Sequence, residues 1–225
     1  AMTDIGIDFV NAPVTGGENP TSRCMIFVTP DGERSLNTYL GISTGLTSDD
    51  VPQAVASKAK LMFLEGYLFD HDAGKTAFRE AARAATAGGG MAGIAISDPF
   101  CVERHRDDFL ALIENDLGYV IGNEAELRAL WETDDTEVAL ARTAEICPLV
   151  VCTRSGDGVT LMRGEERVDV PVEKVVPVDA TGAGDQFAAG FLYGMATDRD
   201  LETCGKMGNI CAAEVISHIG PRPQT

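Results

Sequence analysis

Short apolar runs alternate with amphipathic segments from about residue 60 onward. The runs "LMFLEGYLF", "MAGIAIS", "LGYVIG" and "PLVVCTR" are separated by segments such as "AGKTAFREAARAATAGGG" and "CVERHRDDFLALIEND". Apolar runs of this length are typical of buried strands, and the intervening segments of about 10 to 16 residues are typical of covering helices. The pattern predicts an α/β fold: a Rossmann-like, mostly parallel sheet sandwiched by helices.

Both ends of the chain depart from this alternation. "PLVVCTRSGDGVTLMRGEERVDVPV" predicts three short strands with tight glycine turns, and two helices follow at about 183–197 and 201–218. "SRCMIFVTPDGERSLNTYLG" has a Pro-Asp-Gly turn between two extended runs, which predicts a hairpin that needs a partner because an isolated ribbon is marginally stable in water. We therefore expect residues 1–45 to form part of a small β lid and residues 46–225 to form the core.

Composition narrows the classes of function. Lys and Arg total 18 against 35 Asp and Glu, and the resulting net charge of -17 argues against a nucleic-acid partner. No stretch approaches the roughly 18 consecutive apolar residues that a membrane span needs. The six cysteines lack the close pairs of a zinc site, so we expect reduced core thiols. The N-terminus has no secretory pattern, which makes the cytoplasm the expected location.

Polar residues follow the apolar runs repeatedly. They include Glu65, Asp98, Asn123, Thr153 and the loop at 179–185. Each one alone is typical of a strand end or a helix cap. However, ligands of open parallel sheets bind outside the carboxyl ends of the strands, so the coincidence of these residues at one edge predicts a site there.

The loop within "DATGAGDQFAAGF" has a structural and a functional interpretation. Gly182 and Gly184 permit a tight turn into a helix, and Asp185 complements the positive end of that helix. Alternatively, the N–H groups of Gly182, Ala183, Gly184 and Asp185 bind a phosphate. The loop lacks the Gly-Lys-Ser/Thr of a Walker A motif. It is not a dinucleotide fingerprint either, because Phe187 stands where the third glycine belongs.

An acid beside a phosphate site needs a chemical reason. Phosphoryl transfer supplies one, because a base must lie within reach of the attacking hydroxyl group. The helix dipole is expected to help keep Asp185 ionised. Asp185 is therefore the candidate catalytic base.

These residues resemble the ribokinase-like (PfkB) carbohydrate and nucleoside kinases. The loop is similar to that family's C-terminal signature, in which the glycines form an anion hole and the last Asp deprotonates the acceptor hydroxyl group. "GNEAEL" resembles the family's N-x-x-E element, which implies that Asn123 and Glu126 organise Mg²⁺ through its waters. "VVCTRSGDGVTL" resembles the nucleotide-side hairpin and implies roles for Thr153 and Gly158, although Ser155 stands where many members have glycine.

Within the family, "TSRCMIFVTPDGERSLNTYLG", "ISDPF" and "AAEVISHIGPRP" look most similar to adenosine kinases. The resemblance implies that Asn209 and Ala213 contact the adenine. Arg34 and Asn37 either face the substrate pocket or belong to an exposed hairpin. Asp179 either helps to hold a monovalent cation such as K⁺ or fixes the turn.

The activity implied is ATP-dependent transfer of the γ-phosphoryl group to a primary hydroxyl of a nucleoside or sugar. Family members carry an N-terminal segment ahead of the point where this sequence starts, with part of the lid and of the acceptor site. We therefore expect an incomplete acceptor half, and the alternative function is a nucleotide-binding module without activity. Apolar surface that the missing segment would cover makes a homodimer a further expectation.

Overall fold

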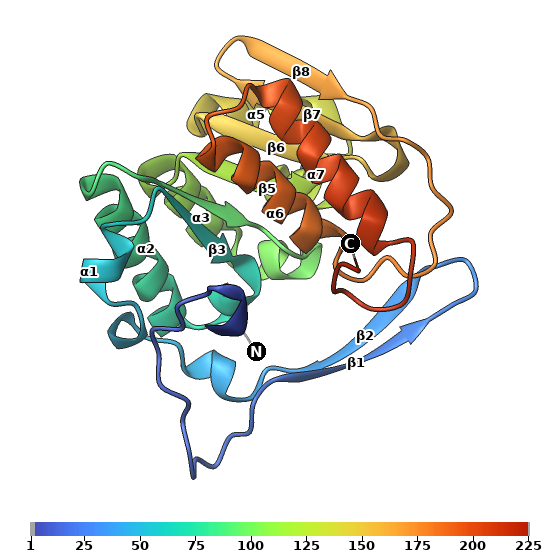
Figure 1. Ribbon diagram of the computed structural model, residues 1–225. Helices are drawn as coiled ribbons and strands as arrows, with labels where there is room; N and C mark the ends of the chain where they lie inside the picture. Colours follow the sequence, from blue (N-terminus) through green and yellow to red (C-terminus); the bar gives the residue numbers. More distant parts are fainter. Residues whose placement is uncertain (1–2, 225) are drawn as a thin grey trace.

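A six-stranded sheet with helices on both faces forms the body of the molecule (Figure 1). The computed structural model describes residues 3–224 and confirms the predicted α/β class. Strands run in the order β3-β4-β5-β6-β7-β8; β3 to β6 are mutually parallel, β7 pairs antiparallel with β6, and β8 pairs antiparallel with β7. The strands are β3 Leu61–Glu65, β4 Met91–Ala95, β5 Tyr119–Asn123, β6 Leu149–Thr153, β7 Val159–Arg163 and β8 Glu166–Val170.

The helices divide into two layers. Those on one face are α2 Asp72–Ala87, α3 Pro99–Asp116, α4 Glu124–Trp131 and α5 Thr136–Ile146, and those on the other are α6 Ala183–Ala196 and α7 Leu201–Val215. Phe78, Phe109 and Leu127 pack in the first layer, whereas Phe187 and Phe191 pack in the second. Short elements complete the chain: α1 Gln53–Ala56 and the 3₁₀ turns η1 Thr3–Ile5, η2 Gly41–Gly45, η3 Ser48–Asp50, η4 Gly66–Asp70 and η5 Ser155–Asp157.

Two helices begin directly at the carboxyl edge of the parallel strands. Asp98 caps α3 by accepting hydrogen bonds from the N–H groups of Phe100 (2.8 Å) and Cys101 (3.2 Å), and Pro99 occupies the first turn. Asn123 ends β5 and caps α4. Because these caps follow β4 and β5 at once, the same edge of the sheet collects their polar side chains.

The predicted hairpin is a separate two-stranded ribbon of β1 Arg23–Val28 and β2 Arg34–Tyr39. Nearly all of its residues are exposed, including Met25 and Phe27. Gly32 in its turn is the only fully buried residue among residues 3–40. The expectation that all cysteines are core thiols is wrong at Cys24, which is exposed because neither face of the ribbon is covered.

The C-terminal helices lie close to where the sequence places them. Helix α7 ends at Val215, three residues short of the predicted boundary at 218, and Ile216 forms its C-cap. Among residues 3–224, no helix has the length and apolar character needed to cross a membrane.

Candidate functional site

The loop before α6 takes a shape that glycine alone fits easily. Gly182 has a φ of 84°, and a Cβ atom there would lie 2.8 Å from the Pro221 Cβ. A Cβ atom on Gly184 would meet no atom within 4 Å, so the first turn of α6 faces open space. The start of this helix is therefore accessible to a ligand.

Asp179 holds this loop in place. It is 2% exposed, and its carboxylate accepts hydrogen bonds from the N–H groups of Thr181 and Gly220 (both 2.9 Å) and from the Thr181 hydroxyl. Burial acts to raise the pKa of Asp179, but these hydrogen bonds outweigh it and the pKa lies below its usual value. Of the two roles considered for Asp179, these contacts support fixing the turn. A monovalent cation stays a prediction.

The helix start offers free backbone donors. Within residues 3–224, the N–H groups of Gly182, Gly184 and Asp185 donate to no protein acceptor. The N–H group of Ala183, which was expected in the same set, instead donates to the Ala180 carbonyl at 3.3 Å. Unpaired N–H groups at a helix N-terminus favour an anion.

Asp185 differs from Asp179 in exposure and in hydrogen bonding. Its side chain is solvent-accessible, and no hydrogen bond or ion pair involves its carboxylate among the described residues. Partial desolvation by the surrounding protein raises the pKa of Asp185, and the charge of Arg34 opposes this. Desolvation therefore acts against the expected effect of the helix dipole, and the predicted role of that dipole in keeping Asp185 ionised stays a prediction.

The charges of Asp185, Glu65 and Asp98 act on one another or on Tyr67, and these four residues are called the Asp185 cluster. The sequence indicated no role for Glu65 or Tyr67 beyond the end of a strand. The Ser97 hydroxyl donates to Glu65, and Ser97 has a left-handed φ of 68°. Burial raises the pKa of Glu65, the Ser97 hydrogen bond opposes this, and the charge of Asp185 adds to it. Burial also raises the pKa of Tyr67 to about 12, with further contributions from Asp98 and Glu65. The left-handed serine was the missed signal, and it does not show in the sequence.

Asn123 and Glu126 form a reciprocal capping box at the start of α4. Glu126 N–H donates to Asn123 Oδ1 (2.9 Å), while Asn123 N–H and Nδ2 donate to the Glu126 carboxylate (2.9 and 2.7 Å). Glu126 is 7% exposed, and burial raises its pKa to about 7. Within residues 3–224, no three His, Cys, Asp or Glu side chains are placed to hold a metal directly. The predicted role of Glu126 toward Mg²⁺ through water stays a prediction.

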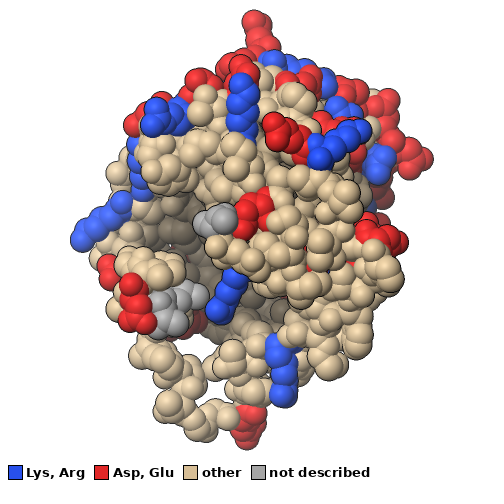
Figure 2. Space-filling view, turned by 45° about the vertical axis from the view of Figure 1, so that its right-hand side comes forward, with Lys and Arg blue, Asp and Glu red and all other residues tan. Residues whose placement is uncertain are grey.

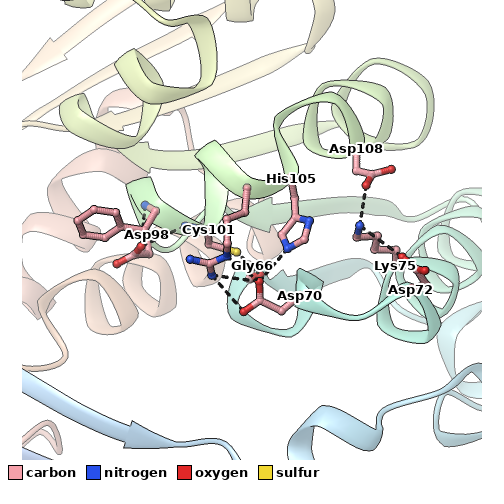
Figure 3. A network of polar contacts seen from close by, with 10 residues as sticks. Gly66, Asp70, Asp72, Lys75, Asp98, Cys101, His105 and Asp108 are labelled. Atoms are coloured by element: carbon pink, nitrogen blue, oxygen red, sulfur yellow. Dashed lines mark hydrogen bonds and ion pairs between the residues drawn. The ribbon is translucent and has the colours of Figure 1, made fainter.

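Figure 3 shows the contacts that join η4 to α3, the helix that begins after Asp98. Arg104 (3.0 Å) and His105 (2.8 Å) both contact Asp70, at the end of η4. His105 has non-helical backbone angles, so α3 is kinked where it meets η4. The Cys101 thiol contacts the Gly66 carbonyl at 3.5 Å, which ties the start of α3 to the start of η4.

The residues predicted on the nucleotide side lie on the other half of the sheet edge. Thr153 ends β6 and pairs with Asn123 and Val159. Gly158 has a φ of 90°, and a Cβ atom there would lie 2.0 Å from the Val170 carbonyl oxygen, so the hairpin requires glycine. Asn209 is buried and donates to the carbonyls of Val170 and Pro171 (both 3.2 Å). Its amide nitrogen therefore joins α7 to the end of β8.

Ala213 lies on α7, one turn beyond Asn209, and is half-buried. None of the contacts formed by the described residues joins Ala213 or Asn209 to Asp185. The predicted contacts of Asn209 and Ala213 with adenine stay predictions.

The two predicted substrate residues of the ribbon occupy opposite faces. Side chains alternate along a strand, so Arg34 and Asn37, three positions apart on β2, point to opposite sides. The charge of Arg34 acts on Tyr67, Asp179 and Asp185. Arg34 thus acts on the Asp185 cluster, whereas the structure does not place Asn37 with it.

The surface of the molecule is hollowed between the β1–β2 ribbon and the core (Figure 2). A separate cavity of about 860 Å³ lies at the opposite edge of the sheet, where Met91, Gly118 and Pro148 begin or precede β4, β5 and β6. No predicted site residue lines that cavity. The chemistry of the Asp185 cluster, rather than cavity size, therefore identifies the candidate site.

A free acid, open backbone donors and a buried capping-box acid at one sheet edge are the features expected for phosphoryl transfer. The model of the pfkB family carbohydrate kinases matches residues 1–225. The chain belongs to the pfkB family. Members of this family are phosphotransferases that act on hydroxyl groups, and the architecture described above is that of ribokinase-fold kinases.

Two solved structures resemble the chain at TM-score 0.89. An adenosine kinase from Sinorhizobium meliloti is 47% identical, and the match covers 92% of this chain and 64% of that one. A probable sugar kinase from Rhizobium etli is 46% identical, with 92% and 63% covered. An uncharacterized sugar kinase of Archaeoglobus fulgidus is 28% identical over 93% of this chain and 82% of its own length. This chain thus spans less than two thirds of the two solved relatives.

Proposed function

We propose that this chain transfers the γ-phosphoryl group of ATP to a primary hydroxyl of a nucleoside, adenosine-like, or of a sugar. The observation that supports this most directly is the unpaired carboxylate of Asp185 at an open helix N-terminus, one residue from the free N–H group of Gly184. Family membership supplies the reaction class. The contacts of the site supply a role for each residue.

Asp185 accepts the proton of the attacking hydroxyl, and its raised pKa makes it a stronger base than an ordinary Asp. The N–H groups of Gly182 and Gly184, with the dipole of α6, stabilise the negative charge of the transferring group. Ala183 joins them once its weak bond to Ala180 is exchanged for the ligand. Arg34 faces the same space and complements the charge of the donor.

Mg²⁺ fits the donor set on the α4 side. It binds carboxylate oxygen, keeps several waters and takes other ligands from substrate phosphates, so a dedicated protein cage is not required. Glu126, held by Asn123, is the residue that would orient its waters. When bound, Mg²⁺ neutralises charge on the phosphates. Thr153, Gly158, Asn209 and Ala213 form the nucleotide side of the proposed site, and K⁺ beside Asp179 is part of the same proposal.

The acceptor is open between two classes. The adenosine kinase and the probable sugar kinase match this chain at 47% and 46% identity, a difference too small to favour either. Tyr67, which is 45% exposed as a residue, and the Glu65 carboxylate both offer hydrogen bonds to hydroxyl groups. Substrate screening must therefore include nucleosides and sugars.

The test is a calorimetric titration of the chain with Mg·ATP, followed by a phosphorylation assay against adenosine, cytidine, ribose and fructose. We expect saturable binding and product from one class of acceptor. Binding without any product would instead support the inactive nucleotide-binding module. Absence of both, in a chain shown to be folded by circular dichroism, would contradict the proposal.

A further inference from the structure

The β1–β2 ribbon is attached to the catalytic loop through its turn. Gly32 is buried while the strands on both sides of it are exposed. Its carbonyl oxygen accepts a hydrogen bond from the Ala180 N–H group at 3.1 Å. Ala180 directly follows Asp179, so the ribbon contacts the chain one residue past the acid that fixes the loop.

The turn has little freedom to make this contact differently. Gly32 has a φ of 83°, and a Cβ atom there would lie 2.9 Å from the Pro177 carbonyl oxygen and 3.1 Å from the Pro177 Cβ. The Gly32 N–H group donates to the Thr29 carbonyl (2.9 Å), which closes the turn. A side chain at Gly32 would therefore displace the turn from the loop as well as strain the backbone.

The loop is held from two sides. On the core side, the N–H group of Val178 donates to the Ile216 carbonyl at 2.8 Å, and Asp179 accepts from Gly220. On the ribbon side, Gly32 holds the Ala180 N–H group, while the Ala180 carbonyl accepts from Ala183 at the start of α6. A displacement of the ribbon therefore acts on the residue that contacts the first turn of α6.

The same turn places Arg34. Two residues span at most about 7 Å of extended chain, so anchoring Gly32 confines the Arg34 backbone to the neighbourhood of the loop. The charge of Arg34 acts on Asp179 and Asp185 from this position. Without the anchor, the exposed ribbon has no other buried residue to hold Arg34 there.

We propose that Gly32 is a positioning residue that holds the Arg34 guanidinium and the loop 179–185 in one arrangement. It touches neither the donor nor the acceptor. It acts through Ala180 on the donors of the anion hole and through two residues of chain on Arg34. Only its kinetic consequences rest on the proposed function; the contact itself is independent of the reaction.

The test compares Gly32→Ala with Gly164→Ala. Gly164 lies in the turn between β7 and β8 with a φ of 57°, so alanine there carries the same kind of backbone strain, but its Cβ would meet no atom within 4 Å. The first readout is the hydrogen-exchange rate of the Ala180 amide, which NMR measures in the absence of nucleotide. Losing one backbone hydrogen bond is expected to speed this exchange by about tenfold in Gly32→Ala. Gly164→Ala should leave it at the native rate.

The second readout is kinetic. Gly32→Ala is expected to lower kcat by about tenfold or more, since small misplacements of reacting groups are costly. The acid limb of its pH–rate profile should also move to higher pH, because Arg34 no longer opposes the raised pKa of Asp185. Loss of stability alone would not move that limb.

The proposal would be overturned if the Ala180 amide of Gly32→Ala exchanged at the rate of the unaltered chain. It would also be overturned if Gly164→Ala lost as much kcat as Gly32→Ala. If the unaltered chain neither binds Mg·ATP nor forms product, the proposed function fails. The exchange rate of Ala180 then still decides whether Gly32 anchors the loop.

Discussion

Asp179 and Asp185 stand six residues apart in one loop, yet their surroundings are opposite. Asp179 is buried and its carboxylate accepts three hydrogen bonds, which lower its pKa. Asp185 is accessible, has no hydrogen-bonding partner among the described residues, and has a raised pKa. The difference teaches that hydrogen bonding to the charged form, rather than the identity of the residue, separates the acid that fixes the loop from the proposed base.

The largest expected effect is the loss of activity when Asp185 is replaced. Asp185→Asn should lower kcat by about 10²- to 10⁴-fold, because it removes the proposed base, and should leave the affinity for Mg·ATP nearly unchanged. Thermal unfolding should change little, since no contact of Asp185 is lost. Asp134→Asn, an exposed change between α4 and α5, is the matched control for kinetics. Turnover by Asp185→Asn at the rate of the unaltered chain would remove Asp185 from the mechanism.

The second prediction concerns Glu126, a buried acid whose hydrogen bonds from Asn123, unlike those of Asp179, do not outweigh the effect of burial on its pKa. Its pKa is about 7 in the folded protein against a reference value of 4.5, so the folded state binds the proton more tightly. Stability from this group is present below 4.5 and is lost as the pH rises through 7, by roughly 3 kcal/mol at most. Urea unfolding without Mg²⁺, repeated across this range, measures it. Glu126→Gln should remove this slope, and a slope of the same size in that variant would contradict the assignment.

The third prediction tests the structural acid. Asp179→Asn replaces one acceptor oxygen by an NH₂ group and leaves a buried N–H group unpaired, which should cost about 2 kcal/mol of stability. Because the folded pKa of Asp179 is lowered, its stabilisation is present above its reference value of 3.8 and is lost as the pH falls through the folded pKa. Asp179→Asn should therefore also weaken the acid dependence of unfolding. A variant as stable as the unaltered chain would mean that these hydrogen bonds contribute nothing.

The smallest effect is expected at Arg34. Its charge lowers the pKa of both Asp179 and Asp185, but only Asp185 takes part in the proposed reaction. Arg34→Gln should move the acid limb of the pH–rate profile upward, by less than about one pH unit, because the two groups face open solvent. Asn37→Ala, on the opposite face of β2, should leave that limb unchanged. An equal shift in both variants would show that Arg34 does not act on Asp185.

Much of the site could be predicted from the sequence because its residues follow strands in order along the chain. Asn123, Glu126, Thr153 and the loop at 179–185 all lie at the carboxyl edge, as the alternation of apolar runs and helices requires. The surroundings of Asn37 and Asn209 were not part of that prediction, and their predicted ligand contacts stay predictions. Strand alternation turns Asn37 away from Arg34, and the amide nitrogen of Asn209 bonds the end of β8. The first outcome follows from strand alternation, whereas the second depends on a packing partner about 40 positions away that no local pattern contains.

The sequence by itself determined the α/β class, the glycine turn before α6 and the helix caps, because each follows from periodicity or from a residue's own backbone preferences. Only the tertiary structure decided the protonation behaviour of the acids, since burial, hydrogen bonds and the nearby Arg34 charge come from residues far apart in the chain. It alone joined Gly32 to Ala180, across almost 150 positions. Desolvation and charge act through space, whereas backbone preference acts along the chain.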